Sequence, residues 1–284
     1  MANRCPHGAY PPGPMVPDGH TPPRLLSIAG SDSGGGAGIQ ADLKAFAACG
    51  AHGMTAITAI TAQNTERVSA VYPLPPEAIV AQVRAVVEDI GVDAVKIGMV
   101  GTVEAIEAVD RALDLLPPGV PVVLDPVMVA ESGGRLLEAD AERTLRERLV
   151  ARATVVTPNV MEAAALAGLD GVSDVGDLAR AVHALGPAAV VVTGGHRVAG
   201  GDLFYDGERL VEIPGERHPD GAAHGSGCTH SSVLAAHLAL GLDPLEAARR
   251  AQAMASAAVG AGLRGIGAGP GPVDVLGVLA RRSG

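Results

Sequence analysis

The chain has 284 residues, 48% of them hydrophobic and 18% charged, so it has enough apolar material for a sizeable core, which excludes a disordered or fibrous protein. Its 31 acidic residues outnumber 21 basic ones, and the net charge of −10, without a basic run or aromatic platforms, argues against nucleic-acid binding. Three scattered cysteines in no CxxC pattern favour a reducing cytoplasm over a disulfide framework or zinc site, and no apolar run reaches the ~18 residues of a membrane helix.

The two ends of the chain differ in composition from its middle. Residues Met1–Pro23 are rich in proline and glycine and have no periodic apolar pattern, which predicts a disordered tail. A signal peptide would need an apolar stretch that this segment lacks. Glycines from Gly265 to Gly271 predict a loop before a short last helix. No long linker lies between the ends, so we expect one domain over residues 24–284.

Short apolar runs alternate with helical patterns along that domain. The predicted strands are Leu25–Ala29, Thr55–Thr61, Ala94–Ile97, Val120–Leu124, Thr154–Thr157, Val190–Thr193, and a hairpin of Asp202–Tyr205 with Leu210–Ile213. The predicted helices are Ile39–Ala48, Glu77–Glu88, Val103–Leu116, Thr229–Leu240 and Pro244–Val259, with a further one opened by Pro158 and Asn159. This alternation predicts an α/β fold with a parallel sheet covered on both faces, and ligands in such sheets bind beyond the carboxyl ends of the strands.

The first loop at that edge, Gly30–Gly38, holds five glycines. Glycine lets a backbone approach a ligand closely. Gly36, Gly38 and Ala41 fit the loose dinucleotide fingerprint, but the next strand ends in Gln63-Asn64 without the acidic residue that this fingerprint requires. A dinucleotide site is therefore disfavoured. Close approach to another ligand and a purely structural turn both stay open.

A second glycine loop, His224–Thr229, stands directly before an alanine-rich helix. Its glycines would leave backbone N–H groups unpaired at the helix N-terminus, an arrangement suited to a phosphate. Cys228 would lie in the first helical turn, where we expect the pKa of its thiol to be lowered. An ordinary helix start with a buried cysteine is the open alternative.

Two acidic residues lie at the ends of predicted strands. Asp125 follows an apolar strand, and Glu162 stands three residues after Asn159. Such carboxylates often hold a metal or orient a ligand, while Asn159 is also a common type of helix N-cap. An anion loop, two acids and the lack of a Walker lysine together indicate phosphoryl transfer with Mg²⁺.

The segment Ser27–Lys44 and the loop His224–Thr229 closely resemble hydroxymethylpyrimidine/phosphomethylpyrimidine kinases, thiamine-pathway members of the ribokinase-like superfamily. The resemblance continues through Thr61–Thr65, Lys96–Met99, Leu124–Met128, Thr157–Glu162, Gly194–His196 and Gly265–Gly267. It implies a ribokinase-like three-layer α/β/α sandwich with a mostly parallel sheet. It also implies a homodimer that uses ATP with Mg²⁺ to phosphorylate 4-amino-5-hydroxymethyl-2-methylpyrimidine and then its monophosphate.

The same resemblance assigns the pyrimidine contacts to Gly30, Asp42, Gln63 and Met99. Gln63 offers both a donor and an acceptor, which match an aminopyrimidine edge. Asp42 can accept a hydrogen bond from an amino group, with a helix-surface acid as the alternative. The thioether of Met99 can lie against a ring, with a plain core methionine as the alternative.

The remaining roles concern the phosphates. By resemblance, Gly225, Ser226 and Gly227 form the anion hole, Cys228 is the general base, Asn159, Thr193 and Gly195 bind the nucleotide, and Asp125 and Glu162 bind the metal. We expect Cys228 to matter most for the alcohol substrate, because the monophosphate is already an anionic nucleophile.

Two departures from the family pattern remove positive charge near the phosphates. Thr193 stands where relatives often have lysine, and Gly221–Ala223 replaces Lys-Asn-Thr. Two other functions stay open: pyridoxal kinase, whose substrate is a related hydroxymethyl heterocycle, and a non-catalytic pyrimidine sensor. The presence of Asn159, Glu162 and Cys228 speaks against the sensor.

Overall fold

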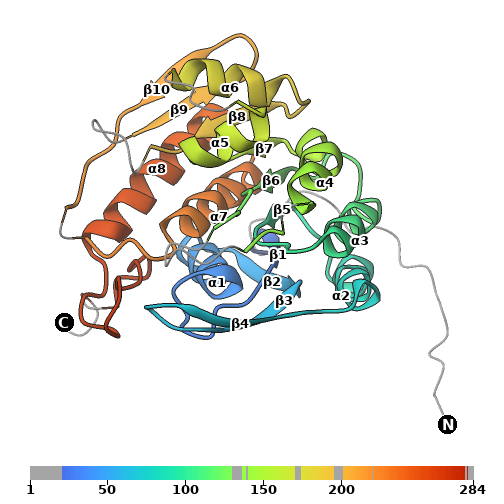
Figure 1. The fold of residues 1–284 in the computed structure, drawn as a ribbon, viewed down its shortest axis with the longest axis horizontal. Coiled ribbons are helices and arrows are strands. Elements are labelled where there is room, and N and C mark those ends of the chain that lie inside the picture. Colours follow the sequence, from blue (N-terminus) through green and yellow to red (C-terminus); the bar gives the residue numbers. More distant parts are fainter. Residues whose placement is uncertain are drawn as a thin grey trace.

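The structure is a computed structural model that describes residues 21–129, 136–138, 140–169, 174–194, 201–219, 221–278 and 280. The tail predicted over Met1–Pro23 falls outside these residues except for its last three, and its disorder stays a prediction. The remaining chain forms one layered unit around a central sheet (Figure 1).

The central sheet has eight strands in the order β10-β9-β8-β7-β6-β5-β1-β2. The strands are β1 (Arg24–Ala29), β2 (His52–Ile57), β5 (Ala94–Ile97), β6 (Val122–Leu124), β7 (Val155–Val156), β8 (Ala189–Val192), β9 (Asp202–Tyr205) and β10 (Leu210–Ile213). The pairs from β2 to β8 are parallel, whereas the pairs β8–β9 and β9–β10 are antiparallel, so β9 alone runs against the other strands of this sheet. The predicted α/β fold with a mostly parallel sheet is confirmed.

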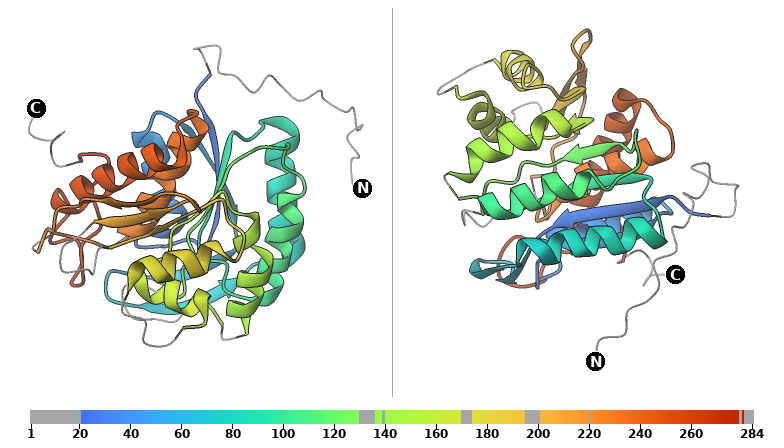
Figure 2. Two further views of the ribbon diagram at one scale, coloured as in Figure 1. Left: turned by 90° about the horizontal axis from the view of Figure 1, so that it is seen from above. Right: turned by 90° about the vertical axis from the view of Figure 1, so that its right-hand side faces the viewer.

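Helices cover both faces of this sheet, as the two views of Figure 2 show. One face carries α2 (Pro76–Asp89), α3 (Val103–Leu113), α4 (Ala141–Arg148), α5 (Val160–Ala167) and α6 (Val175–His183). The other carries α1 (Gly38–Ala48), α7 (Ser226–Ala239) and α8 (Pro244–Gly260). The three layers are therefore α/β/α, as the resemblance implies.

The burial of the strands explains why they read as unbroken apolar runs. Successive side chains of a strand point to opposite faces of the sheet. Leu25 and Val123 contribute to the core under α1, α7 and α8, whereas Leu26 and Val122 contribute to the core under the other helices. Because both faces are covered, most strand positions are apolar, and the buried polar ones, such as Ser27 and Lys96, are paired. Phe46 and Phe204 are the fully buried aromatic side chains of the described residues.

A small antiparallel hairpin stands apart from the main sheet. It consists of β3 (Ala59–Gln63) and β4 (Val68–Pro73). The prediction of a single strand over Thr55–Thr61 is wrong, because the chain leaves the main sheet at Thr58. The hydroxyl of this buried threonine donates to the Met99 carbonyl over 2.7 Å, and β3 begins in a new direction.

Several elements differ from the predicted set. The helices α4 and α6 and the 3-10 turn Val150–Arg152 are not among the predicted elements. The sequence of α4, AERTLRER, has few apolar residues to reveal a helical period. No helix follows α8 in the described residues up to Val278, so the predicted last helix is absent from that part of the chain.

Candidate active site

The parallel strands deliver most of the predicted site residues to one edge of the sheet. Gly30 follows β1, Met99 lies two residues after β5, Asp125 follows β6, Asn159 lies after β7, and Thr193 follows β8. Cross-strand contacts hold neighbouring strand ends together: the Gly30 N–H donates to the Met99 carbonyl over 3.1 Å, and the Thr193 N–H donates to the Pro158 carbonyl over 2.8 Å. The edge expected to bind ligands is thus a continuous line of loops.

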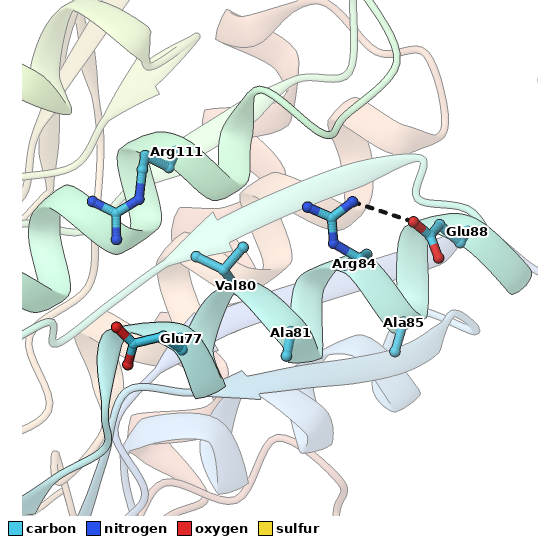
Figure 3. A pocket seen from close by; sticks show the side chains of 7 residues that line it. All are labelled: Glu77, Val80, Ala81, Arg84, Ala85, Glu88 and Arg111. Carbon is cyan, nitrogen blue, oxygen red and sulfur yellow. Dashed lines mark hydrogen bonds and ion pairs between the residues drawn. The ribbon is translucent and has the colours of Figure 1, made fainter. Parts of the chain in front are cut away.

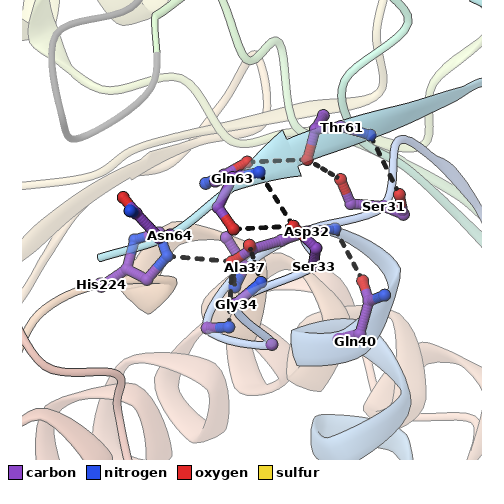
Figure 4. Close-up of polar contacts among 12 residues, drawn as sticks. Ser31, Asp32, Ser33, Gly34, Ala37, Gln40, Thr61, Gln63, Asn64 and His224 are labelled. Carbon is purple, nitrogen blue, oxygen red and sulfur yellow. Dashed lines mark hydrogen bonds and ion pairs between the residues drawn. The ribbon is translucent and has the colours of Figure 1, made fainter. Parts of the chain in front are cut away.

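The first glycine loop is organised around the carboxylate of Asp32, which is 1% exposed. This carboxylate accepts hydrogen bonds from the backbone N–H groups of Gly34 (2.7 Å), Gly36 (2.9 Å) and Ala37 (2.8 Å) (Figure 4). Such converging N–H groups could otherwise hold a phosphate. Since Asp32 already accepts their hydrogen bonds, the loop is an internally satisfied turn in this structure.

The side chain of His224 joins the second glycine loop to the first. Its Nε2 lies 3.0 Å from Asp32 Oδ2 (Figure 4). Burial raises the pKa of the Asp32 carboxyl, but the hydrogen bonds from His224 and the loop N–H groups outweigh burial and hold that pKa below its usual value. A side chain on Gly36 would collide with the His224 ring, and one on Gly225 would collide with the Gly36 carbonyl. The two loops therefore touch directly.

The second loop begins α7 as the anion-site prediction requires. Gly225 is the N-cap with φ +84°, a left-handed conformation that favours glycine. The Ser226 N–H turns back to the Ala223 carbonyl over 2.9 Å. Helix geometry leaves the N–H groups of Gly227 and Cys228 without an intrahelical acceptor. No atom lies within 4 Å of a Cβ position on Gly227, so the space beside this turn is open.

The expectation of a lowered pKa for Cys228 is wrong. Desolvation raises the pKa of the thiol to about 12, and the negative charges of Asp42 and Asp125 act in the same direction. Lys96 and a hydrogen bond from the Gly38 N–H lower the pKa but do not balance these effects. The helix start alone suggested an activated cysteine, but the carboxylates that decide its pKa come from other elements.

A buried ion-pair network lies beneath the site. Asp42 and Lys96 are both 0% exposed, and Lys96 Nζ lies 2.9 Å from Asp42 Oδ1 and 4.0 Å from Asp125 Oδ2. Asp42 also accepts hydrogen bonds from the hydroxyls of Ser27 (2.6 Å) and Ser232 (2.8 Å). The alternative interpretation of Asp42 as a helix-surface acid is therefore wrong. In this structure the Asp42 carboxylate accepts hydrogen bonds from Lys96, Ser27 and Ser232.

Asn159 and Glu162 form a capping box at the start of α5. The Glu162 N–H donates to Asn159 Oδ1, and the Asn159 N–H donates to Glu162 Oε2, both over 2.9 Å. Helix capping by Asn159 is thus confirmed. Burial and the nearby charge of Asp125 raise the pKa of Glu162 to about 7, and burial likewise raises the pKa of Asp125. Two close, poorly solvated carboxylates remain on the edge of the sheet.

The predicted pyrimidine contacts lie where β1, β3 and β5 end. Met99 is 7% exposed, and its sulfur lies so close to Gly30 that a Cβ there would be only 2.8 Å away. The backbone of Gln63 exchanges hydrogen bonds with the Ser33 hydroxyl at 2.7 and 2.8 Å (Figure 4). The Gln63 carboxamide oxygen accepts a long 3.3 Å bond from Thr61. The strand turn and the glycine loop thus orient Gln63 from both sides.

Some site predictions gain no position here. Gly195 lies outside the described residues, so its nucleotide role stays a prediction. Among the described residues, no group of three or more His, Cys, Asp or Glu side chains forms a ready metal cluster.

No helix in the described part of the chain is long and apolar enough to cross a membrane. A groove between α2 and α3, lined by residues such as Glu77, Val80, Arg84 and Arg111, includes none of the predicted site residues (Figure 3).

Several structurally important residues have no role in the sequence prediction. They are Asp32, Lys96, His224, Ser231 and Ser232. Lys96 is one of only two lysines in the chain and stands in an apolar strand, which was the available signal, since a charge at such a place must be paired. Ser231 donates to Asp125 over 3.1 Å, and its position one helical turn after Gly227 gave no comparable signal.

Comparisons with known proteins show which family the chain resembles. The family described as Phosphomethylpyrimidine kinase matches residues 32–274. The hydroxymethylpyrimidine/phosphomethylpyrimidine kinase of Rhizobium meliloti is 49% identical over 87% of this chain and 95% of its own. The thiamine biosynthesis bifunctional protein ThiED of Geobacter sulfurreducens is 43% identical over 88% of this chain and 51% of its own. An ADP complex of Bacillus subtilis pyridoxal kinase is 37% identical, has a TM-score of 0.82, and covers 91% of this chain and 99% of its own.

The raised pKa of Glu162 predicts how stability changes with pH. The group titrates near 7 in the folded chain and near its ordinary 4.5 when unfolded, so the folded state binds more protons between these values and loses stability as pH rises. We expect Glu162→Gln, which can still cap α5, to raise the free energy of unfolding by about 1–3 kcal/mol at pH 8 and much less at pH 4. Urea unfolding at both pH values in a chelating buffer measures this difference.

A matched variant, Glu147→Gln, removes one charge from an exposed position on α4. It controls for the change in net charge alone. A Glu162→Gln protein that is less stable than the native chain at pH 8 would contradict the assignment of Glu162 as a strained, partly protonated acid.

Proposed function

The chain belongs to the phosphomethylpyrimidine kinase family, and we propose that it transfers a phosphoryl group from ATP to 4-amino-5-hydroxymethyl-2-methylpyrimidine and then to its monophosphate, in thiamine biosynthesis. One observation carries this proposal within the structure. The open turn Gly225–Cys228 stands on the same edge as the Gly30–Gly38 loop and the acidic pair Asp125 and Glu162, so the acceptor, phosphate and metal sites proposed below would adjoin one another.

We propose that the pyrimidine binds at Gly30, Gln63 and Met99. The Gln63 carboxamide has a donor and an acceptor for the aminopyrimidine edge, and the Met99 thioether provides a polarizable surface for the ring. Asp42 lies beneath this place. Its contact with a substrate amino group requires that one of the two serine donors, Ser27 or Ser232, turn away.

The nucleotide and its metal are proposed to bind at the neighbouring strand ends. Asn159 and Thr193 meet in a β-bridge there, with Gly195 following in the chain. The carboxylates of Asp125 and Glu162 fit Mg²⁺, because they are oxygen ligands that lie close together and are poorly solvated, and burial is the main cause that raises the pKa of each. Two protein carboxylates suffice, since Mg²⁺ usually keeps waters and phosphate oxygens as its other ligands. When bound, Mg²⁺ would neutralise charge on the phosphates.

The backbone of Gly225, Ser226 and Gly227 is proposed to stabilise the transferring phosphoryl group. Within this turn the N–H groups of Gly227 and Cys228 have no intrahelical acceptor and would serve the developing negative charge, whereas the Ser226 N–H already donates to the Ala223 carbonyl. Cys228 is proposed to take the proton of the substrate alcohol. Its thiol is protonated at neutral pH, with Asp125 among the groups that raise its pKa, so compensation of the Asp125 charge would favour the base form.

An ATP-dependent assay tests the proposed function. Purified chain, Mg²⁺, ATP and the hydroxymethylpyrimidine are expected to yield monophosphate and then diphosphate, each with an equivalent of ADP, resolved by anion-exchange chromatography. Pyridoxal in a parallel reaction tests the second candidate, which the similarity to the Bacillus subtilis pyridoxal kinase favours. A higher kcat/KM on pyridoxal would replace the pyrimidine assignment. Tight pyrimidine binding without ADP formation would identify a sensor.

The role proposed for Cys228 predicts unequal effects on the two phosphorylations. We expect Cys228→Ser to lower the rate on the alcohol ~100-fold, because loss of a general base typically costs 10²–10⁴. The rate on the monophosphate should fall much less, since its attacking oxygen is already anionic. Cys49→Ser, at a cysteine of α1's C-cap, is the matched control. Equal losses on both substrates would contradict this role.

We also propose a homodimer that forms through the β3–β4 hairpin. Ile60 and Tyr72 are directly opposite one another in this hairpin and are 43% and 61% exposed, an unusual amount of apolar surface for paired strands. Light scattering is expected to give twice the chain mass for the native protein and the single mass for Ile60→Asp/Tyr72→Asp. A native protein that is monomeric at micromolar concentration would refute the proposed dimer.

A further inference from the structure

The position of the second glycine loop depends on a contact that crosses 192 positions of the sequence. His224 Nε2 reaches Asp32 Oδ2 at 3.0 Å, and both side chains are buried, with 7% and 1% exposed. Asp32 is held in turn by three N–H groups of its own loop. Because Asp32 is fixed in this way, its carboxylate holds the His224 imidazole at one position. The contact therefore fixes the position at which the chain enters α7.

The contact surfaces around this pair leave little room for adjustment. The His224 ring lies on Gly36, and the backbone of Gly225 lies on the Gly36 carbonyl, so closely that a side chain at either glycine would collide. The Gly225 N-cap is the residue next to His224 in the chain. A shift of the imidazole would therefore move the anion loop by a comparable distance.

The same pair is linked to the pyrimidine side. Ser33, next to Asp32, exchanges hydrogen bonds with the backbone of Gln63. On the other side of His224, its N–H donates to the Gly271 carbonyl, and Gly269 donates to the Thr65 hydroxyl over 3.2 Å, at the tip of the hairpin that carries Gln63. Gln63 and the tip of the β3–β4 turn are thus tied, through Ser33 and through Gly269–Gly271 respectively, to the two residues of this pair.

We propose that Asp32 and His224 form a positioning pair that fixes the distance between the pyrimidine pocket and the anion loop, an inference that rests on the proposed kinase function. The pair touches neither reacting atom. It acts by holding the backbone of Gly225–Cys228 at the position where the transferring phosphoryl group meets the substrate oxygen. Its loss should therefore lower kcat and leave the KM for the pyrimidine nearly unchanged, because the contacts of Gly30, Gln63 and Met99 persist.

Substitutions of His224 test this role with a built-in rescue. Gln can place an N–H donor near the position of Nε2, whereas Asn is too short to reach Asp32 and Leu cannot donate. We expect His224→Leu and His224→Asn to lower kcat ~10–100-fold, since small misplacements at a reacting centre can cost 10²-fold, with KM within about threefold of the native value. His224→Gln should recover most of the native kcat. The matched control is His237→Asn, at the distant end of α7, where the imidazole contacts only the Val233 carbonyl among the partners identified for it.

The outcomes separate this inference from the proposed function. Circular dichroism and thermal unfolding identify any variant that fails to fold. If His224→Leu fails to fold, the comparison of kcat between His224→Gln and His224→Asn still tests the proposed pair. Three results would overturn the positioning pair while leaving the kinase function intact. They are His224 variants that match the native kcat, variants that raise KM at the native kcat, and a His224→Gln protein that is no more active than His224→Asn. A native chain that forms no ADP with the pyrimidine would overturn the proposed function itself.

Discussion

Lys96, the one lysine or arginine that is buried among the described residues, holds the candidate active edge of the sheet together. It lies in β5, between β1 and β6, and its ammonium faces Asp42 of α1 and Asp125 at the end of β6. A charge without water is tolerated only when it is paired and hydrogen-bonded, so the elements that supply these carboxylates are constrained to remain in register around it. Ser232 of α7 completes the arrangement through Asp42. Helices of one face and strands of the sheet are thereby fixed at one point.

One cation among several acids leaves this edge short of positive charge. The excess is visible in the raised pKa values of Asp125, Glu162 and Cys228, which all respond to burial and to a neighbouring carboxylate. The family positions that often carry lysine near the phosphates do not supply a replacement, since Thr193 and Gly221 stand at those positions without charge. In the proposed kinase reaction, backbone N–H groups and a cation bound with the nucleotide would therefore have to balance the charge of the phosphates.

The sequence allowed much of the fold to be predicted because the relevant signals are local. Apolar strands such as Ala94–Ile97 and the order of the glycine loops determine the parallel sheet and the line of strand ends. What local patterns could not reveal is where distant groups meet. The N–H groups of the Gly30–Gly38 loop are taken by Asp32, the thiol of Cys228 is governed by acids from other elements, and a hydroxyl–carbonyl contact to Met99 redirects the chain at Thr58.

The occupied first loop has a consequence for selectivity. Two adjacent turns of glycine-rich backbone could compete for the same phosphate, and a nucleotide bound in the wrong one would be unproductive. Asp32 acts as a tethered internal anion, so a dissolved phosphate would have to displace a carboxylate of the same chain from the N–H groups of Gly34, Gly36 and Ala37. The first turn is thus disfavoured as a phosphate site, and it does not compete with the anion loop proposed at Gly225–Cys228.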